Sequence, residues 1–260
     1  MRNKELGDIV ARGRTADIHT WGEGQVVKLY HDWFLLPWIK NEASRTAVIN
    51  QLPLPVPKVG ELLEINGRNG LEFEHLDGKN MLELLDEDSS LGANFAKRLA
   101  QLQIKMHRLD VDHIELRSQR EKLVDNIGRA APLSDEMKQM LLAQLEQLPD
   151  GQSLCHGDFH PGNIVVAAGQ EYIVDWNDCS LGNPLADLAR STILFIGGIT
   201  GNEEPNPEFE ALVTAFHDHY LYRYLELYSA DEAEQAAARA EYEQWLPIIA
   251  GARLCEGITT

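Results

Sequence analysis

The stretch LCHGDFHPGNIVV, which begins at Leu154, constrains this chain more than any other part of its sequence. It places two histidines, an aspartate and an asparagine around a Pro-Gly break, between apolar flanks. A Pro-Gly pair interrupts regular structure, so these polar side chains are expected in a loop between two buried segments. Such a loop suits a metal site, a phosphoryl-transfer site or a polar turn.

The spacing of three polar residues favours phosphoryl transfer. Asp158 and Asn163 are five residues apart, as are the Asp and Asn of the protein-kinase loop H-R-D-x-x-x-x-N. Asp175 follows in YIVDW, after a segment that predicts a hairpin around Ala168-Gly169-Gln170. Phosphoryl transfer needs a carboxylate that orients the attacking hydroxyl, and oxygen ligands for the Mg²⁺ that bridges the phosphates. A loop followed by a hairpin would bring Asn163 and Asp175 to one metal ion.

A metal site is the alternative for the same stretch. If HGDFH formed a strand, His156, Asp158 and His160 would project from one face and could bind zinc or iron as a metallohydrolase does. Pro161-Gly162 would end that strand at once, and no other His, Cys or Glu cluster in the sequence offers a further ligand. This alternative therefore explains fewer residues, and tightly bound zinc or iron would identify it.

The first part of the chain predicts a small α+β lobe. TADIHTWGEGQVVKLY indicates a hairpin around Gly22-Glu23-Gly24, and GELLEINGRNGLEFEHLDG indicates two strands around turn residues 66–70. Between them, FLLPWIKNEASRTAVINQL predicts a helix whose apolar stripe holds Ile39, Ala43 and Ala47. LPLPVPKV cannot lie inside a helix, because three prolines alternate there.

The small lobe also contains the other polar residues that a kinase needs. Lys28 lies in the predicted strand QVVKLY, and Glu42 lies in the predicted helix. Kinases use a strand lysine to bind the phosphates and a helix glutamate to hold that lysine. The preceding segment GRTADIH stands where a phosphate-covering loop belongs, although it contains only Gly13 and no G-x-G-x-x-G.

After Gly78 the pattern becomes helical. NFAKRLAQLQIKMHRL repeats apolar residues at helical spacing, and Ser134 is the expected N-cap of the next helix. Ser229-Ala230-Asp231-Glu232 resembles a capping box before a helix that we expect to end or bend near Pro247. We therefore predict one lobe over residues 1–78 and a second over residues 79–260.

Charge and cysteine content limit the function. The chain has 260 residues and a net charge of −18, which disfavours nucleic acid as a partner. Its three cysteines form no C-x-x-C pair, so we expect a reducing compartment. No apolar segment reaches the length of a membrane span, and the amino terminus lacks a signal-peptide pattern. A cytoplasmic protein without a membrane partner is the expectation.

Taken together, these motifs resemble those of the aminoglycoside phosphotransferase family, which shares its fold with choline kinases and protein kinases. The family pattern H-G-D-x-H-x-x-N corresponds to residues 156–163, its Asp-Trp to Asp175-Trp176, and its G-x-P-x-x-D-x-A run to residues 182–189. The resemblance implies an α+β, two-lobed protein kinase-like fold with a small antiparallel-sheet lobe and a larger, mainly helical lobe. It also implies transfer of the ATP γ-phosphate to a small-molecule hydroxyl.

The resemblance implies a role for each matching residue. Asp158 would be the catalytic base, Asn163 and Asp175 would bind Mg²⁺, and Lys28 would contact the phosphates while paired with Glu42. The remaining implied positions are the backbone of Glu74 and Leu76 for adenine, His156 as a brace of the loop, and Asp187 as a hydrogen-bonding support of the same loop. His160 lies where protein kinases often place a lysine, and Asn177 stands where many family members carry an acid.

The motifs do not identify the nucleotide donor or the acceptor. ATP or GTP with Mg²⁺ would serve as the donor, and a kinase-like protein that binds nucleotide without catalysis is an alternative, although base and metal ligands are all present. Protein-kinase activity is disfavoured because no A-P-E segment follows Asp175. Acceptors in this family include aminoglycosides, amino alcohols and sugars. The acid surplus, with Asp178, Glu203, Glu204 and Glu256, predicts an acidic rim that attracts a cationic acceptor.

Overall fold

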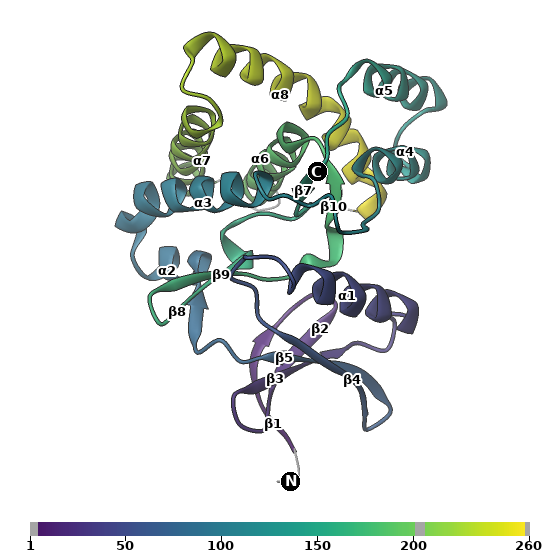
Figure 1. Cartoon of the computed structure of the whole chain (residues 1–260), viewed down its shortest axis with the longest axis vertical. Coiled ribbons are helices and arrows are strands. Elements are labelled where there is room, and N and C mark those ends of the chain that lie inside the picture. The colour runs from purple at the N-terminus through teal and green to yellow at the C-terminus, as the bar shows by residue number, and fades with distance from the viewer. Residues whose placement is uncertain (1–4, 201–205, 258–260) are drawn as a thin grey trace. The chain divides into compact units, whose positions relative to one another are not determined.

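The computed structural model describes residues 5–200 and 206–257 and divides into two compact units (Figure 1). The first unit consists of Met1–Met81 together with Asn163–Asn177, and the second of Leu82–Gly162 together with Asp178–Thr260. The chain therefore crosses from one unit to the other within the motif found in the sequence. Asn163 and Asp175 fold with the first unit, whereas Asp158 folds with the second.

A five-stranded antiparallel sheet forms most of the first unit, in the order β1-β2-β3-β5-β4. The strands are β1 (Leu6–Arg12), β2 (Ala16–Trp21), β3 (Gln25–Tyr30), β4 (Val59–Ile65) and β5 (Arg68–Glu74). Helix α1 (Leu36–Ile49) packs beside β4 and β5, as Figure 1 shows. A second, three-stranded sheet joins β6 (Gly78–Asn80) to the hairpin of β8 (Ile164–Ala167) and β9 (Gln170–Ile173).

Local sequence explains the turns of these sheets. Asn66 and Gly67 connect β4 to β5 with φ angles of 53° and 80°, the left-handed conformation that a two-residue hairpin turn requires. Gly22 and Gly24, between β2 and β3, also have positive φ. The predicted hairpins are confirmed. Gly70 is not a turn residue, however, because it lies inside β5.

Two expectations for the first unit need correction. Strand β1 was not expected, and its side chains after Leu6 are exposed, so it carries no apolar alternation. The buried stripe of α1 consists of Ile39, Glu42, Thr46 and Ile49, whereas Ala47 is exposed. An apolar pattern cannot detect this stripe, because one of its members is a carboxylate that is buried by an ion pair rather than by hydrophobicity.

Helices form most of the second unit. They are α2 (Met81–Glu87), whose first residue is counted with the first unit, α3 (Gly92–His107), α4 (Gln119–Arg129), α5 (Asp135–Gln147), α6 (Pro184–Thr200), α7 (Pro207–Tyr228) and α8 (Glu232–Arg253). Helix α3 packs against α7, and α6 packs against α8 (Figure 1). Of the four residues at the predicted helical spacing, Phe95, Leu99 and Met106 are buried and Leu102 is half-buried. Strand β7 (Ser153–Cys155) ends just before the loop that carries Asp158 and pairs antiparallel with β10 (Ser180–Gly182).

The ends of the helices test the cap predictions. Ser134 caps α5 as expected, because its hydroxyl accepts a hydrogen bond from the N–H of Met137. The N-cap of α8 is Asp231 and not Ser229, whose hydroxyl instead donates to the Glu234 carboxylate. Helix α8 also continues through Pro247 to Arg253, so the proline does not end it.

Two composition-based expectations can be compared with the structure. Cys155, Cys179 and Cys255 are all free thiols. Within the described residues, no helix combines the length and the apolar character that crossing a bilayer requires.

The capping of α8 gives a testable prediction. The Asp231 carboxylate accepts hydrogen bonds from the N–H groups of Ala233 and Glu234 at 2.8 and 3.0 Å. Asp231→Ala should lower the free energy of unfolding by about 1 kcal/mol, because both donors lose their acceptor. Asp231→Asn keeps an acceptor oxygen and should cost much less. Urea denaturation followed by circular dichroism measures both variants, and a cost for Asp231→Asn as large as that for Asp231→Ala would show that the acceptor oxygen does not stabilise the helix.

Candidate active site

A cluster of charged side chains lies in the first unit. The Nζ of Lys28, on β3, is 2.7 Å from Oε1 of Glu42 on α1 and 3.4 Å from Oδ1 of Asp175. Tyr30 donates a hydrogen bond to the other oxygen of Glu42 at 2.7 Å. The side chains of Lys28 and Glu42 are only 10% and 2% exposed, whereas that of Asp175 is 40% exposed. The structure thus brings three of the predicted site residues together.

The electrostatics keep Lys28 charged inside this unit. Burial by itself lowers the pKa of Lys28, but the charges of Asp175 and Glu42 and their hydrogen bonds outweigh it, so the pKa is raised. Lys28 therefore remains a cation with one buried partner and one exposed partner. A cation in this arrangement can bind a phosphate without leaving Glu42.

The hairpin β8–β9 places Asn163 beside the residue that precedes Asp175. Asn163 ends the short 3-10 turn of residues 161–163, and its carbonyl accepts a hydrogen bond from the N–H of Val174 at 3.0 Å. Asp175 adopts a φ of 63°, which is uncommon for a residue with a side chain and is typical of functional sites. Its Oδ1 also accepts from the side-chain amide of Asn177 at 2.8 Å.

These donors fit the metal that the fold implies. A carboxylate and an amide oxygen are hard ligands of the kind that Mg²⁺ prefers, and the Asp175 carboxylate is partly open to solvent. The Asp175 carboxylate contacts the Lys28 ammonium and the Asn177 amide, so its surroundings are those of a hard oxygen ligand.

The two residues expected at adenine lie where the sheet ends. Glu74 is the last residue of β5, and its N–H donates to the carbonyl of Lys58 at 2.8 Å. Leu76 follows in the irregular segment before β6. The N–H of Glu74 is therefore already used within the sheet.

In the second unit, Asp158 lies in a loop that is held by short-range hydrogen bonds. His156 is fully buried, and its Nδ1 accepts from the N–H of Asp158 at 3.2 Å. His160 repeats this pattern, because its Nδ1 accepts from the N–H of Gly162 at 3.1 Å. The Nε2 of His160 is 3.7 Å from Oδ2 of Asp158, while Arg190 is 3.9 Å from Oδ1.

The surroundings of Asp158 keep it ionised. Burial raises the pKa of this carboxyl, but the hydrogen bond and charge of His160, together with the charges of Arg190 and His156, outweigh burial and lower the pKa. Its side chain is 31% exposed. An ionised, accessible carboxylate can orient a substrate hydroxyl and accept its proton.

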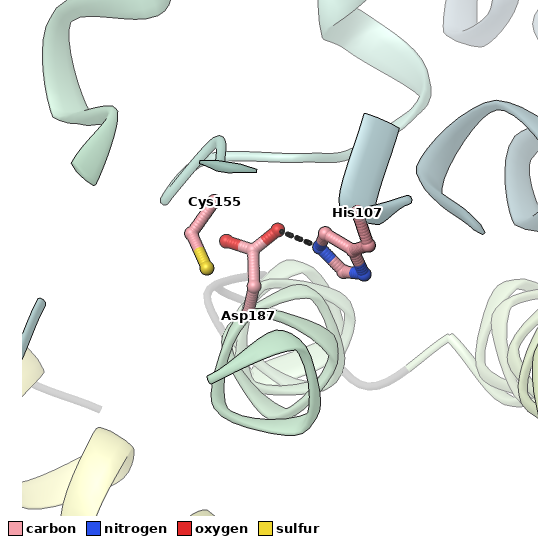
Figure 2. Close-up of side chains that lie close together, drawn as sticks. All are labelled: His107, Cys155 and Asp187. Carbon is pink, nitrogen blue, oxygen red and sulfur yellow. Dashed lines mark hydrogen bonds and ion pairs between the residues drawn. The ribbon is translucent and has the colours of Figure 1, made fainter. Parts of the chain in front are cut away.

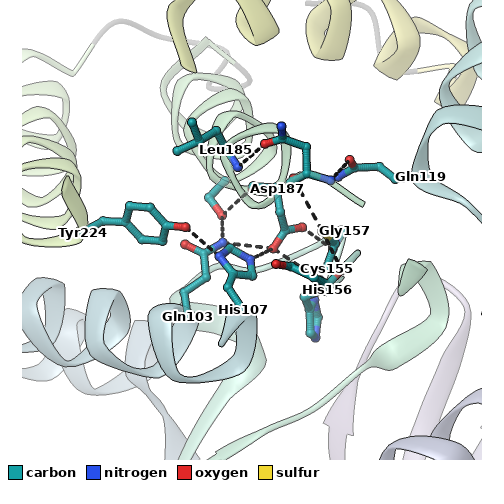
Figure 3. Close-up of polar contacts among 12 residues, drawn as sticks. Gln103, His107, Gln119, Cys155, His156, Gly157, Leu185, Asp187 and Tyr224 are labelled. Atoms are coloured by element: carbon teal, nitrogen blue, oxygen red, sulfur yellow. Dashed lines mark hydrogen bonds and ion pairs between the residues drawn. The ribbon is translucent and has the colours of Figure 1, made fainter. Parts of the chain in front are cut away.

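Asp187, at the start of α6, binds the loop that precedes Asp158 at His156 and Gly157 (Figure 3). Its carboxylate accepts hydrogen bonds from the N–H groups of Gly157 at 2.7 Å and His156 at 3.3 Å. Gln103 and His107 on α3 donate to the same group at 3.1 and 3.0 Å. Burial by itself raises the pKa of Asp187. The hydrogen bond and charge of His107, with smaller effects of Gly157 and His156, outweigh burial, so the pKa is lowered. The carboxylate is thus buried and charged, with four donors.

His107, Cys155 and Asp187 form the group of potential metal ligands found among the described residues (Figure 2). Both ring nitrogens of His107 are already engaged, with Asp187 and with the Tyr224 hydroxyl at 2.6 Å. Burial raises the pKa of the Cys155 thiol, which disfavours the thiolate that a metal needs. The group is therefore a buried hydrogen bond between His107 and Asp187, with the Cys155 thiol beside it donating to a backbone carbonyl. His156, Asp158 and His160, the set required by the metallohydrolase alternative, do not form such a group.

The predicted acidic rim is largely neutralised where the structure describes it. Asp178 is paired with Lys122 at 2.6 Å, and Glu256 is paired with Arg190 at 2.7 Å. All four side chains line one recess of the second unit beside Gly157. Glu203 and Glu204 lie outside the described residues. Asp178 and Glu256 therefore do not present the free negative charge that their sequence suggested.

Several residues that shape the site were not expected from sequence. Arg190 contacts the Asp158 loop, and His107, Gln103 and Tyr224 complete the network around Asp187. A signal was available for Arg190, since it follows Asp187 by three residues and so shares its helix face. The polar residues of α3 gave a weaker signal, because Gln103 and His107 are four apart on one face of an amphipathic helix.

Comparison with known proteins agrees with this geometry. The profile of the family described as "Phosphotransferase enzyme family" matches residues 12–228. The chain belongs to this family. A search of curated protein sequences finds no match.

Solved structures show that the fold is protein kinase-like, with a small antiparallel-sheet lobe and a larger helical lobe. An aminoglycoside-3'-phosphotransferase of type VIII is 19% identical, with 94% of each chain covered and a TM-score of 0.55. Amicoumacin kinase hAmiN, in complex with AMP-PNP, Ca²⁺ and Ami, is 16% identical with a TM-score of 0.58, over 98% of this chain and 81% of its own. Aminoglycoside phosphotransferase APH(3'')-Id from Streptomyces rimosus, in complex with ADP and streptomycin, is 17% identical over 92% and 94%, with a TM-score of 0.52.

The buried charge of Asp187 gives a prediction on stability. Asp187→Asn should lower the free energy of unfolding near pH 7 by about 3 kcal/mol, because four hydrogen bonds to a buried charge are weakened or lost. The pKa of Asp187 is lower in the folded state than in the unfolded chain, where an Asp carboxyl has a pKa of about 3.9. The charge of Asp187 therefore contributes its full stabilisation above the unfolded-state pKa, and this contribution is lost as pH falls toward the folded-state pKa. The difference between wild type and variant should therefore shrink progressively as pH falls below about 5.

Urea denaturation across this pH range measures the effect. Asp218→Asn is the matched control, because Asp218 is 74% exposed and 3.7 Å from His217. A difference between wild type and Asp187→Asn that stays constant or grows as pH falls would contradict the assigned charge of Asp187.

Proposed function

We propose that this phosphotransferase transfers the γ-phosphate of ATP, bound with Mg²⁺, to a hydroxyl of a small molecule. The observation that carries the proposal is the cluster of Lys28, Glu42 and Asp175. A buried lysine that is held by a buried glutamate, and that also faces an accessible carboxylate, is the arrangement that phosphate and metal binding require. The same cluster has no evident purpose in an apolar core, because burying an ion pair gains little stability.

Each predicted residue then has a proposed role. Lys28 binds the phosphates while Glu42 fixes its ammonium group, and Asn163 with Asp175 holds the metal. When bound, Mg²⁺ would neutralise charge on the phosphates. The backbone of Glu74 and Leu76 binds the adenine edge.

The acceptor side of the reaction belongs to the second unit. Asp158 orients the acceptor hydroxyl and takes its proton as the new P–O bond forms, while the bond from the γ-phosphorus to the oxygen shared with the β-phosphate breaks and ADP leaves. His156 and Asp187 hold the backbone on either side of Gly157, so that the base keeps its direction. We propose that residues 1–78 form the nucleotide-binding lobe and residues 79–260 the catalytic and acceptor-binding lobe. Within the second lobe, Asn163–Asn177 folds with the first unit.

The ion pairs of the second unit favour an acceptor of low charge. Aminoglycoside-like compounds, amino alcohols and sugars are all proposed acceptor classes. A polycationic acceptor would have to displace Lys122 from Asp178 or Arg190 from Glu256. Sugars and amino alcohols of low charge require no such exchange, so we place them first in a screen of hydroxyl compounds for ATP and GTP consumption.

Separate substitutions test the two halves of the proposal. Asp158→Asn should reduce turnover by about 10² to 10⁴, the contribution of a positioned base, while MgATP still stabilises the protein against heating. Asp175→Asn should instead weaken the stabilisation by MgATP, because a metal ligand loses its charge. Differential scanning fluorimetry with ATP or GTP, with and without Mg²⁺, measures binding without a known acceptor.

Asp125→Asn is the control for loss of a carboxylate, since Asp125 forms an exposed ion pair with Arg117 and has no proposed part in the reaction. The proposal fails if neither nucleotide stabilises the wild-type protein at millimolar concentration. It also fails if Asp158→Asn abolishes nucleotide binding and Asp175→Asn does not change it.

A further inference from the structure

Arg190 lies one turn after Asp187 in α6 and reaches the same residue of the Asp158 loop, Gly157. Its Nε donates a hydrogen bond to the carbonyl of Gly157 at 3.0 Å. Asp187 accepts from the N–H of Gly157 at 2.7 Å. The N–H and the carbonyl of this glycine are therefore both bound by side chains of one helical turn, three residues apart.

The conformation of Gly157 makes these contacts important for the next residue. Gly157 has a φ of 79°, and a Cβ at this position would lie 2.5 Å from the carbonyl oxygen of Asp178. Only glycine fits such a site without strain. The carbonyl that Arg190 binds belongs to the peptide bond between Gly157 and Asp158, so its direction sets that of the Asp158 backbone.

Arg190 is itself held in place. Its Nη2 is 2.7 Å from Oε1 of Glu256, which follows the end of α8, and the Arg190 side chain is only 12% exposed. Glu256 is also 3.7 Å from Arg253. The guanidinium forms its bond to Gly157 and its ion pair to Glu256 from separate nitrogens, which a lysine ammonium cannot reproduce. The same Nη2 is 3.9 Å from Oδ1 of Asp158.

We propose that Arg190, anchored by Glu256, is a positioning residue that fixes the direction of Asp158 through the Gly157 carbonyl. The inference rests on the proposed role of Asp158 as the base. Glu256 acts only through Arg190, so the turn after α8 supports the reactive carboxylate from a distance in sequence. An acceptor-binding role for Arg190 is the competing explanation, and it predicts no change in the loop of the free protein.

Hydrogen exchange tests the proposal without a known acceptor. Arg190→Met should make the amides of Gly157 and Asp158 exchange about tenfold faster, because the peptide between them loses a charged donor. Arg190→Lys should give a smaller increase. Arg223→Met is the matched control, since Arg223 forms an ion pair with Glu226 on α7, away from the loop. It should leave both amides unchanged.

A double-mutant cycle separates positioning from general stability. Glu256→Gln alone should increase exchange of the same two amides, but it should add nothing to Arg190→Met if Glu256 acts only through Arg190. Additive effects would overturn this part of the inference. If Arg190→Met does not fold, Arg190→Lys and Glu256→Gln carry the same test, because both keep the size of the side chain.

The carboxyl carbon of Asp158 provides a spectroscopic measurement, assigned by comparison with Asp158→Asn. Arg190, His160, His156 and Asp178 are the charged or titratable groups that influence this carboxyl. In Arg190→Met the NMR signal should begin to titrate at higher pH than in wild type, whereas Arg223→Met should match wild type. Unchanged titration together with unchanged exchange would refute the positioning role.

Thermal stabilisation by MgATP distinguishes this inference from the proposed function. Nucleotide stabilisation that persists in Arg190→Met, with faster exchange at Gly157, supports both. Nucleotide stabilisation that is missing in wild type removes the kinase proposal, while the exchange result still decides whether Arg190 orders the loop. With an acceptor from the screen, Arg190→Met should lower kcat about 10²-fold and leave KM for MgATP within about twofold.

Discussion

The structure of the loop that carries Asp158 depends on the hydrogen bonds that converge on the buried carboxylate of Asp187. Four donors from two segments of the second unit, helix α3 and the loop that carries Asp158, converge on it, and two of them are backbone N–H groups just before Asp158. A charge in the protein interior is tolerated only when it is fully hydrogen-bonded. The need to satisfy Asp187 therefore orders the glycine turn at Gly157, and the turn in turn directs Asp158.

The first unit also buries a charged group, the Lys28 ammonium, and neutralises it with different side chains. Lys28 enters a buried environment because Glu42 neutralises it, and Tyr30 satisfies the remaining oxygen of Glu42. Asp175 contacts the same ammonium, and it belongs to Asn163–Asn177, the later segment of the chain that folds with the first unit. The motif that is continuous in sequence thus supplies one carboxylate to each unit, and each unit holds its own by local hydrogen bonds and ion pairs.

Residues with a fixed local spacing were the ones that sequence could predict. Asp158, Asn163 and Asp175 belong to a loop and a hairpin, and Lys28 and Glu42 to a strand and the next helix. Sequence could therefore predict where these residues lie locally, and their chemical roles are the proposal made above. Contacts between distant segments could not be predicted. The inward face of α1 follows from the ion pair of Glu42, and Asp178 and Glu256 are neutralised by Lys122 and Arg190, far away in sequence.

The shared turn of Asp187 and Arg190 has a consequence for how this protein can vary. An α-helix rotates by about 100° for each residue, so inserting or deleting one residue between Pro184 and Asp187, at the start of α6, would rotate both side chains away from Gly157. The loop that carries Asp158 could not follow, because its glycine lies against the Asp178 backbone. Natural length changes in the chain should therefore fall elsewhere, and this segment should keep a constant number of residues while its side chains diversify.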